Sequence, residues 1–255
     1  MSDMLANERI QSDEELAEAL LGEEGRGTKT TETAEFPDEM TILQCFWKIT
    51  KISVPIILVG LAVQVGVTVI NTFFIGNLND ANLLGGVGMG NMLINVGCFA
   101  VVFGLNGALE TFVSQSFGAE KYEECGVFLN RGKLISTLIL IPIFVIFGAS
   151  ERLLIIAGQD PIIAEIARRY SCILIPGIWA QAMFDATTRF LNAQFEIMIT
   201  LYVQIATLIV HIFLCFFFIK VLDGREIGAA MATNVTYILN LVSLELYCYC
   251  SPNLK

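Results

Sequence analysis

Charged residues are scarce in this sequence, and long stretches of it have none. Only 16% of the 255 residues are Asp, Glu, Lys or Arg, while 55% are hydrophobic and the mean hydropathy is +0.67. A soluble domain of this length needs more charge than that to cover its surface. The composition therefore favours a membrane protein over the alternative, a soluble all-helical protein with a large core.

Histidine is also nearly lacking, and the cysteines are not arranged for metal binding. The chain has one histidine, His211, and its seven cysteines contain no Cys-x-x-Cys pair. Zinc sites are built from clusters of these residues, and an enzyme needs a nucleophile–base pair or a metal cluster. We therefore expect no metal, no cofactor and no enzymatic activity. The first 40 residues also lack the apolar segment of a signal peptide, so we expect the first hydrophobic helix to direct membrane insertion.

Six apolar blocks make up most of the remaining chain. A helix rises 1.5 Å per residue, so about 20 apolar residues cross the ~30 Å hydrocarbon core of a bilayer. The blocks are Ile52–Asn79, Ala81–Leu109, Leu134–Ser150, Pro161–Phe184, Ile197–Ile219 and Ile227–Leu244, and the first two carry no charge. The sequence predicts an all-α, polytopic membrane protein with a six-transmembrane-helix bundle.

The acidic residues are concentrated at the start of the chain. Residues 1–40 hold twelve acidic and three basic residues, a net charge of −9, whereas the remainder is close to neutral. This composition predicts a disordered cytosolic tail over residues 1–44, with a regulatory segment as the alternative. The six-helix lobe then spans 45–250, and 251–255 form a short cytosolic tail. The acidity of the N-terminal tail argues against a nucleic-acid partner.

Several of the predicted helices carry polar residues along one face. The stripes recur at helical spacing in five blocks, and amides are frequent in them. Their amide members include Gln64, Asn71, Asn91, Asn95, Gln181 and Asn240. A polar group facing lipid has no hydrogen-bond partner, so these stripes should face the bundle interior. There they either pair with one another or line a wet cavity, and we expect Gln64, Asn71, Asn95, Gln181 and His211 to share one cavity.

Three ionisable residues stand out because charge within a membrane is costly unless it is used or paired. Glu110 ends the second block, Asp185 follows the fourth, and His211 lies in the middle of the fifth. Each also has a structural interpretation. Glu110 can be an interface residue or helix cap, Asp185 can pair with Arg189, and His211 can be a neutral imidazole hydrogen-bonded across helices. Glu110 ranks first and Asp185 second as an ion- or substrate-linked carboxylate.

The motifs resemble those of one transporter family. The run Gly107–Ala119 (GALETFVSQSFGA) resembles the signature after the second helix of the multidrug and toxic compound extrusion (MATE) family. Further resemblances lie at Phe74–Leu78, Arg189–Gln194, His211-Ile212 and Gly228–Thr233, in the family's order, across about residues 45–250. The resemblance is to the N-terminal six-helix lobe of eukaryotic members.

That resemblance implies a function. Family members exchange organic cations and other xenobiotics for protons or sodium, using two six-helix lobes around a central cavity. The expected partners are therefore membrane lipid, small organic cations, a proton or sodium ion, and a second lobe or a second copy. Expected locations are the plasma membrane or a vacuolar or other endomembrane. The alternative is a truncated or diverged half-transporter that acts as a membrane interaction protein without transport of its own.

The ion site implied by the resemblance differs from that of prokaryotic members. Many of those place an Asp near the end of the first helix, and the matching position here is Asn71, with His211 and Cys215 opposite. Topology rests on a separate signal. Lys121, Arg131 and Lys133 cluster between the second and third blocks, and the positive-inside rule then places both termini in the cytosol.

Overall fold

The structure is a computed structural model, and it describes residues 46–47, 50, 65–194 and 196–250. The chain divides into two units, Met1–Val54 and Pro55–Lys255, and the description below concerns the second. Its described part is helical throughout, apart from short turns. After the helix Val65–Gly76, the elements are α3 (Ala81–Ile94), η1 (Asn95–Phe99), α4 (Ala100–Gly118), α5 (Tyr122–Gly148), α6 (Ser150–Ile156), α7 (Pro161–Ala193), α8 (Ile197–Cys215), η2 (Phe216–Val221) and α9 (Arg225–Cys250). The N-terminal tail and Gln64 lie outside the described residues.

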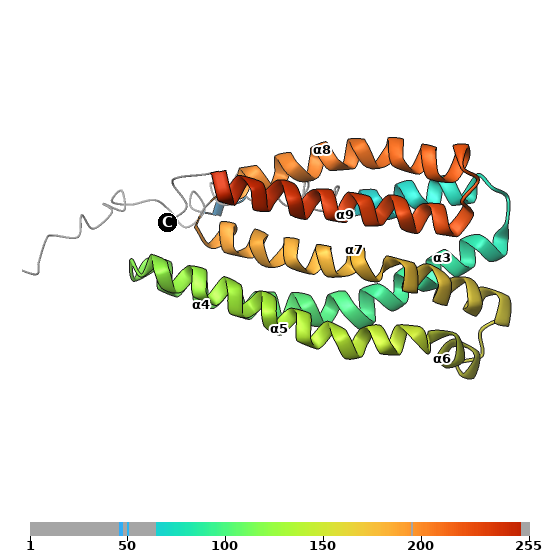
Figure 1. Ribbon diagram of the computed structural model, residues 1–255, viewed down its shortest axis with the longest axis horizontal. Coiled ribbons are helices and arrows are strands. Elements are labelled where there is room, and N and C mark those ends of the chain that lie inside the picture. Colours follow the sequence, from blue (N-terminus) through green and yellow to red (C-terminus); the bar gives the residue numbers. More distant parts are fainter. Residues whose placement is uncertain (1–45, 48–49, 51–64, 195, 251–255) are drawn as a thin grey trace, which may run out of the picture. The chain divides into compact units, whose positions relative to one another are not determined.

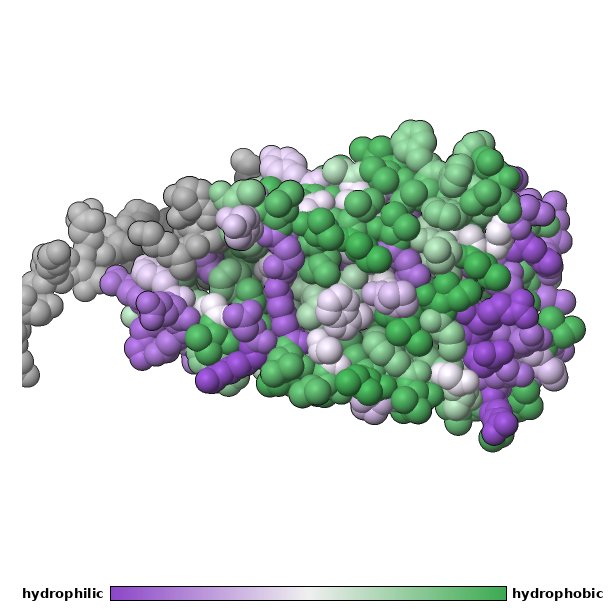
Figure 2. All heavy atoms as spheres, in the orientation of Figure 1, coloured by the Kyte–Doolittle hydropathy of each residue, from purple (hydrophilic) through white to green (hydrophobic). Residues whose placement is uncertain are grey.

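Consecutive long helices run in alternating directions (Figure 1). The α3–η1–α4 segment runs as one long helix with a π-helical interruption, and α8 continues into the π-helix η2 in the same way. Four segments are long and apolar enough to cross a membrane: Ala81–Gly118, Tyr122–Gly148, Ile197–Val221 and Arg225–Cys250. Figure 2 shows the consequence, a hydrophobic surface across the middle with hydrophilic residues at both ends.

Helix α7 is at the centre of the bundle, which explains its less apolar sequence. It packs against α3, α4, α5, α6, α8 and α9. A helix that is screened from lipid by its neighbours can carry polar and charged side chains such as Gln181, Asp185 and Arg189. Of the first predicted block, the structure describes residues 65–79, and Val65–Gly76 form a helix. The other five predicted blocks form helices in the described residues.

Small residues let α3 approach α7 closely. A Cβ atom added to Gly86 would lie 2.4 Å from Ile166, and one added to Gly90 would lie 2.7 Å from Tyr170. Such distances are far below a normal carbon–carbon contact, so both positions require glycine. Gly104, further along the same segment in α4, has no described atom within 4 Å of an added Cβ. Close packing thus depends on the Gly86/Gly90 pair and not on Gly104.

Helix α5 begins a full three turns before the apolar block that predicted it. Its first residue is Tyr122, whereas the block starts at Leu134. The expected basic loop therefore shrinks to a short turn, and Arg131 and Lys133 project from the third and fourth turns of α5. The topology inferred from these bases remains a prediction.

Two helices contain an internal proline, and beside one of them a side chain from another helix replaces a backbone hydrogen bond. Pro142 lies inside α5 and Pro176 inside α7. Next to Pro176, the Gly177 N–H donates to Asn234 Oδ1 at 2.9 Å, while Asn234 Nδ2 donates to the Ile173 carbonyl at 2.7 Å. In a regular helix Gly177 would bond directly to Ile173. The Asn234 amide of α9 is therefore inserted into a backbone hydrogen bond of α7.

Candidate functional site

A cavity of about 320 Å³ opens between the helix Val65–Gly76, α3, η1, α7 and α9. Its polar lining consists of three amides, two threonines and two tyrosines, namely Asn71, Asn91, Asn95, Thr68, Thr233, Tyr170 and Tyr237. Phe99 adds an aromatic face, and aliphatic side chains complete the wall. Among the described residues, its lining includes no carboxylate, ammonium or guanidinium group. These lining residues can therefore offer hydrogen bonds and aromatic faces but no fixed charge.

The π-helix η1 helps shape this cavity. It begins at Asn95 and ends at Phe99, and both residues line the wall. A π-helical insertion shifts the side-chain register of a helix and is frequent at functional sites. On the opposite wall Tyr170 is fully buried, and its hydroxyl donates to Asn91 Oδ1 at 3.1 Å. This bond fixes the orientation of the Asn91 amide, which leaves its NH₂ group as a donor.

Behind the cavity wall, the helix Val65–Gly76, α8 and α9 are joined by buried polar contacts. Asn71 Nδ2 donates to Thr233 Oγ1 at 2.8 Å, and Cys215 Sγ lies 3.3 Å from Asn71 Oδ1. One turn further along α8, His211 Nδ1 lies 2.8 Å from Thr236 Oγ1. Another turn along, Thr207 Oγ1 lies 2.5 Å from Asn240 Oδ1. The polar stripes predicted on these helices therefore pair with one another.

Polar side chains face both ring nitrogens of His211. Nδ1 lies 2.8 Å from Thr236 Oγ1, which itself donates to the Ala232 carbonyl at 2.9 Å. Nε2 lies 3.3 Å from Cys215 Sγ, which donates to Asn71 Oδ1. His211 is fully buried. This arrangement matches the structural interpretation, a neutral imidazole hydrogen-bonded across helices.

A charged cluster joins α4 to α7 further along the bundle. Arg189 Nη1 lies 2.8 Å from Glu110 Oε2, and Arg189 Nε lies 3.6 Å from Asp185 Oδ1. Asn106 Nδ2 donates to Asp185 Oδ2 at 2.8 Å. The Asp185 side chain is 15% exposed and that of Glu110 is 38% exposed. The two predicted carboxylates thus share a single arginine, with Glu110 in the closer pair.

The contacts between these helices keep one register over a long distance. Asn91–Tyr170, Asn106–Asp185 and Glu110–Arg189 are all separated by 79 residues in the sequence. A constant separation means that the α3–η1–α4 segment and α7 run parallel without slipping. Asn95 and Asn106 are eleven residues apart, which at 1.5 Å per residue places the charged cluster roughly 16 Å from the cavity.

The single shared cavity expected from the sequence is not what the structure contains. Asn71 and Asn95 line the cavity, but His211 is buried behind its wall and Gln181 is not part of its lining. Gln181 lies on α7 between Ile178, which lines the cavity, and Asp185 in the charged cluster. Its Oε1 atom is buried without a hydrogen-bond partner among the described residues. The described candidates other than Gln181 therefore fall into a cavity, a buried network and a charged cluster.

Sequence reasoning missed several members of the site. Tyr170 and Phe99 line the cavity, but neither belongs to a polar stripe. Lys133 of α5 also pairs with Glu245 of α9 at 2.5 Å, and Thr187 Oγ1 donates to the same carboxylate oxygen at 2.8 Å. These contacts join residues 58 to 112 positions apart. Local spacing carries no signal for such pairs, whereas Asn91, one turn before Asn95, is visible in the helical pattern.

Comparison with known proteins identifies the family. The MatE family model matches residues 55–217. The chain belongs to the MatE family. Protein DETOXIFICATION 3 of Arabidopsis thaliana is 36% identical over 200 residues, which cover 78% of this chain and 42% of that protein. Protein DETOXIFICATION 6 of the same plant is 33% identical over 199 residues, covering 78% and 41%. The MatE chain described here thus spans less than half the length of these relatives.

Solved structures agree with this assignment. The crystal structure of the eukaryotic MATE transporter AtDTX14 superposes with a TM-score of 0.76 at 30% identity, covering 84% of this chain and 47% of that one. A transporter of the MOP superfamily from Pyrococcus furiosus gives a TM-score of 0.71 at 18% identity, which shows the fold alone. The chain is therefore an all-α, multi-pass integral membrane protein that corresponds to a single lobe of a MATE-type fold.

Proposed function

We propose that this chain forms one lobe of an ion-coupled exporter of organic cations, with a second lobe or a second copy completing the transporter. The proposal is supported by membership of the MatE family and by the polar cavity between α3, α7 and α9. Alternating access requires one bundle to rock against another. The chain by itself should therefore transport poorly.

The excess of negative charge in the α4–α7 cluster is the observation that carries the proposal. Glu110 and Asp185 supply two carboxylates, and Arg189 is the one cation within 4.0 Å of them among the described residues. If both carboxylates are ionised, the cluster carries a net charge of −1. An uncompensated charge in a low-dielectric setting favours binding of a proton or a cation. The cluster is thus suited to take up one coupling ion at a time.

Within the cluster, the geometry favours Asp185 over Glu110 as the ion-binding carboxylate. Arg189 is closer to Glu110, at 2.8 Å against 3.6 Å, and Asp185 is the more buried of the two. The Asn106 amide holds one Asp185 oxygen, and its own Oδ1 atom is buried without a partner among the described residues. A carboxylate beside an amide oxygen suits a sodium ion, and the same carboxylate accepts a proton.

The cavity chemistry suits the proposed substrates. Aromatic faces attract cations, and amide and hydroxyl oxygens accept hydrogen bonds from ammonium groups. Tyr170, Tyr237 and Phe99 supply the aromatic groups, and Asn71 and Asn95 supply the amides. Gln181 lies between the cavity and Asp185 on α7. A shift of α7 caused by ion binding at the cluster would therefore also move the cavity wall.

Vesicle efflux tests this proposal. The chain is reconstituted together with a second six-helix lobe, and efflux of a fluorescent organic cation is followed under an imposed pH or sodium gradient. We expect gradient-driven efflux that Asp185→Asn abolishes and Glu110→Gln weakens. Glu151→Gln is the matched control. Glu151 Oε2 pairs with Arg168 Nε at 2.7 Å, and this ion pair lies at the opposite end of the bundle.

Two results would contradict the proposal. Efflux in the Asp185 and Glu110 variants equal to that of the parent under every gradient would remove the cluster from the mechanism. Efflux by the parent that depends on neither gradient would remove ion coupling itself. A separate comparison identifies the ion. If Asp185→Asn loses efflux driven by a sodium gradient but keeps efflux driven by a pH gradient, the coupling ion is sodium, and the reverse result identifies the proton.

A further inference from the structure

A second pocket, separate from the cavity, lies between α4 and α5. This groove has a volume of about 290 Å³, near the lower limit of typical ligand pockets at about 300–1,000 Å³. Its walls are mostly apolar and include Leu105, Phe112, Phe128 and Ile135. Phe112 is 52% exposed and Ile135 is 48% exposed, so the groove opens on the outside of the bundle. The Phe112 and Phe128 rings stack 5.5 Å apart.

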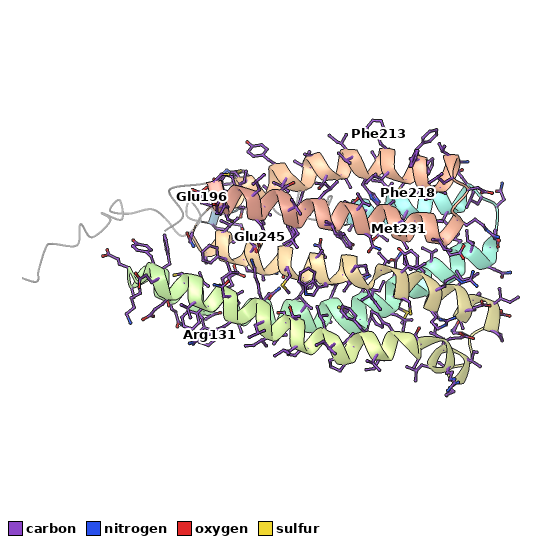
Figure 3. All side chains as sticks on the ribbon, viewed as in Figure 1. Arg131, Glu196, Phe213, Phe218, Met231 and Glu245 are labelled. Atoms are coloured by element: carbon purple, nitrogen blue, oxygen red, sulfur yellow. The ribbon has the colours of Figure 1, made fainter. Side chains whose placement is uncertain are left out.

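One charged side chain, Arg131, lines this groove. No carboxylate lies within 4.0 Å of it among the described residues. Lys133, two residues later, points to nearly the opposite side of α5 and pairs with Glu245. Figure 3 shows Arg131 at the outer edge of α5 and Glu245 on α9. The two basic residues therefore differ in their ion pairing, because Lys133 has a carboxylate partner among the described residues and Arg131 does not.

A polar atom lies deeper in the same groove. Ser136 is 1% exposed, lines the groove, and its Oγ has no hydrogen-bond partner among the described residues. A buried hydroxyl without a partner costs free energy. Ser136 follows Arg131 by five residues, roughly 7.5 Å along the helix axis. The groove therefore presents a cation near its mouth and apolar walls on both helices, while the Ser136 hydroxyl is enclosed beneath its surface.

We infer that this groove binds an anionic phospholipid. The lipid phosphate pairs with Arg131, and one acyl chain lies against Phe112, Phe128 and Ile135. The position of Arg131 supports this occupant. It lies next to the apolar run that begins at Leu134, where lipid phosphate is the anion that a membrane supplies. Arginine also binds phosphate oxygens in a bidentate manner.

Native mass spectrometry of the purified 255-residue chain tests this site. Phosphatidylglycerol and phosphatidylcholine with identical acyl chains are titrated in detergent, and the bound fraction of each is measured. We expect the parent to prefer phosphatidylglycerol. Arg131→Gln should weaken binding of that lipid about fivefold and binding of phosphatidylcholine less, because choline already neutralises the phosphate of the second lipid. Arg152→Gln is the matched control. Arg152 is also exposed and has no carboxylate partner among the described residues. It lies in α6, beyond the far end of α5 from Arg131.

A second variant tests the apolar part of the groove. Ala108 is exposed on α4 and lines the groove, so Ala108→Phe fills it without disturbing the core. We expect this variant to weaken both lipids. Equal binding of the two lipids by the parent, or equal losses in Arg131→Gln and Arg152→Gln, would overturn the proposal. Unchanged binding in Ala108→Phe, or complete displacement of the lipid by inorganic phosphate, would exclude an acyl chain in the groove.

Discussion

The side chain of Asn234 takes the place of a backbone hydrogen bond of Gly177. Its Oδ1 atom accepts from the Gly177 N–H at 2.9 Å, and its Nδ2 atom donates to the Ile173 carbonyl at 2.7 Å. One amide on α9 thus satisfies both groups that the interruption at Pro176 leaves apart in α7. The amide therefore connects α9 to α7 at the interrupted hydrogen bond, next to the cavity residue Leu174.

We predict that Asn234→Leu destabilises the bundle. Leucine has a similar volume but no polar atoms, so the Gly177 N–H and the Ile173 carbonyl lose their partner. The expected loss in unfolding free energy is about 1–3 kcal/mol. Thermal unfolding in detergent measures it, with Asn82→Leu as control because Asn82 is exposed near the start of α3. Equal unfolding temperatures for the two variants would show that the bridging amide contributes nothing.

Gly177 itself should not tolerate a side chain. A Cβ atom at this position would lie 2.2 Å from Asn234 Oδ1 and 3.0 Å from its Cα. We expect Gly177→Ala to destabilise the protein by about 1–3 kcal/mol, since the helices must move apart. Gly104→Ala is the matched substitution in α4, where no atom of the described residues lies within 4 Å of the added Cβ. It should raise stability by about 0.5–1 kcal/mol, because alanine favours helix over glycine. A stable Gly177→Ala variant would refute the close approach.

Removal of Arg189 should make stability depend on pH. Arg189→Gln leaves Glu110 and Asp185 near each other without their shared cation, and two ionised carboxylates repel. The variant should lose about 1–3 kcal/mol, since the cluster is only partly buried. Stability should fall as pH rises, because acid protonates a carboxylate and relieves the repulsion. Unfolding temperatures at about pH 5 and about pH 8 measure this.

The control for that experiment is Arg225→Gln. Arg225 pairs with one carboxylate, Asp80, at 2.6 Å, and its side chain is 54% exposed. A solvated single pair contributes little, about 0–1 kcal/mol. The same pH slope in both variants would mean that the two carboxylates of the α4–α7 cluster do not interact.

Topology gives a further prediction. With both termini in the cytosol, the turn before α5 is cytosolic, and so is Glu123 in the first turn of that helix. A cysteine placed at Glu123 in a cysteine-free background should react with an impermeant thiol reagent only after the membrane is opened. A cysteine at Gln159, in the turn between α6 and α7 at the other end of the bundle, should react in intact cells. Strong labelling at Glu123 from outside would reverse the orientation.

Much of the fold follows from local sequence pattern. Apolar runs such as Ala81–Leu109 predict helices because length and hydropathy are local properties. The helices in the structure are longer than these apolar runs, because charged residues such as Lys133 continue the helix beyond them. The stripe that contains His211 predicts an interior position, which the buried contact with Thr236 confirms. The helical register alone was enough for these inferences.

The contacts between distant helices could not be predicted in this way. Glu110 and Arg189 are 79 residues apart, and neither spacing nor composition indicates that they meet. Asn234 shows the same difficulty. In the sequence it begins an Asn-Val-Thr pattern that resembles a glycosylation site inside a helix, whereas its role depends on the broken hydrogen bond of another helix. Tertiary packing decides both cases.

The separation of 79 residues between Glu110 and Arg189 also sets a time interval during synthesis. At about 5–20 residues per second, Glu110 emerges from the ribosome about 4–16 s before the arginine that neutralises it. During that interval the carboxylate has to stay at the membrane surface or hold a proton. A nascent chain stalled before Arg189 would leave Glu110 of α4 without the cation that pairs with it in the folded protein.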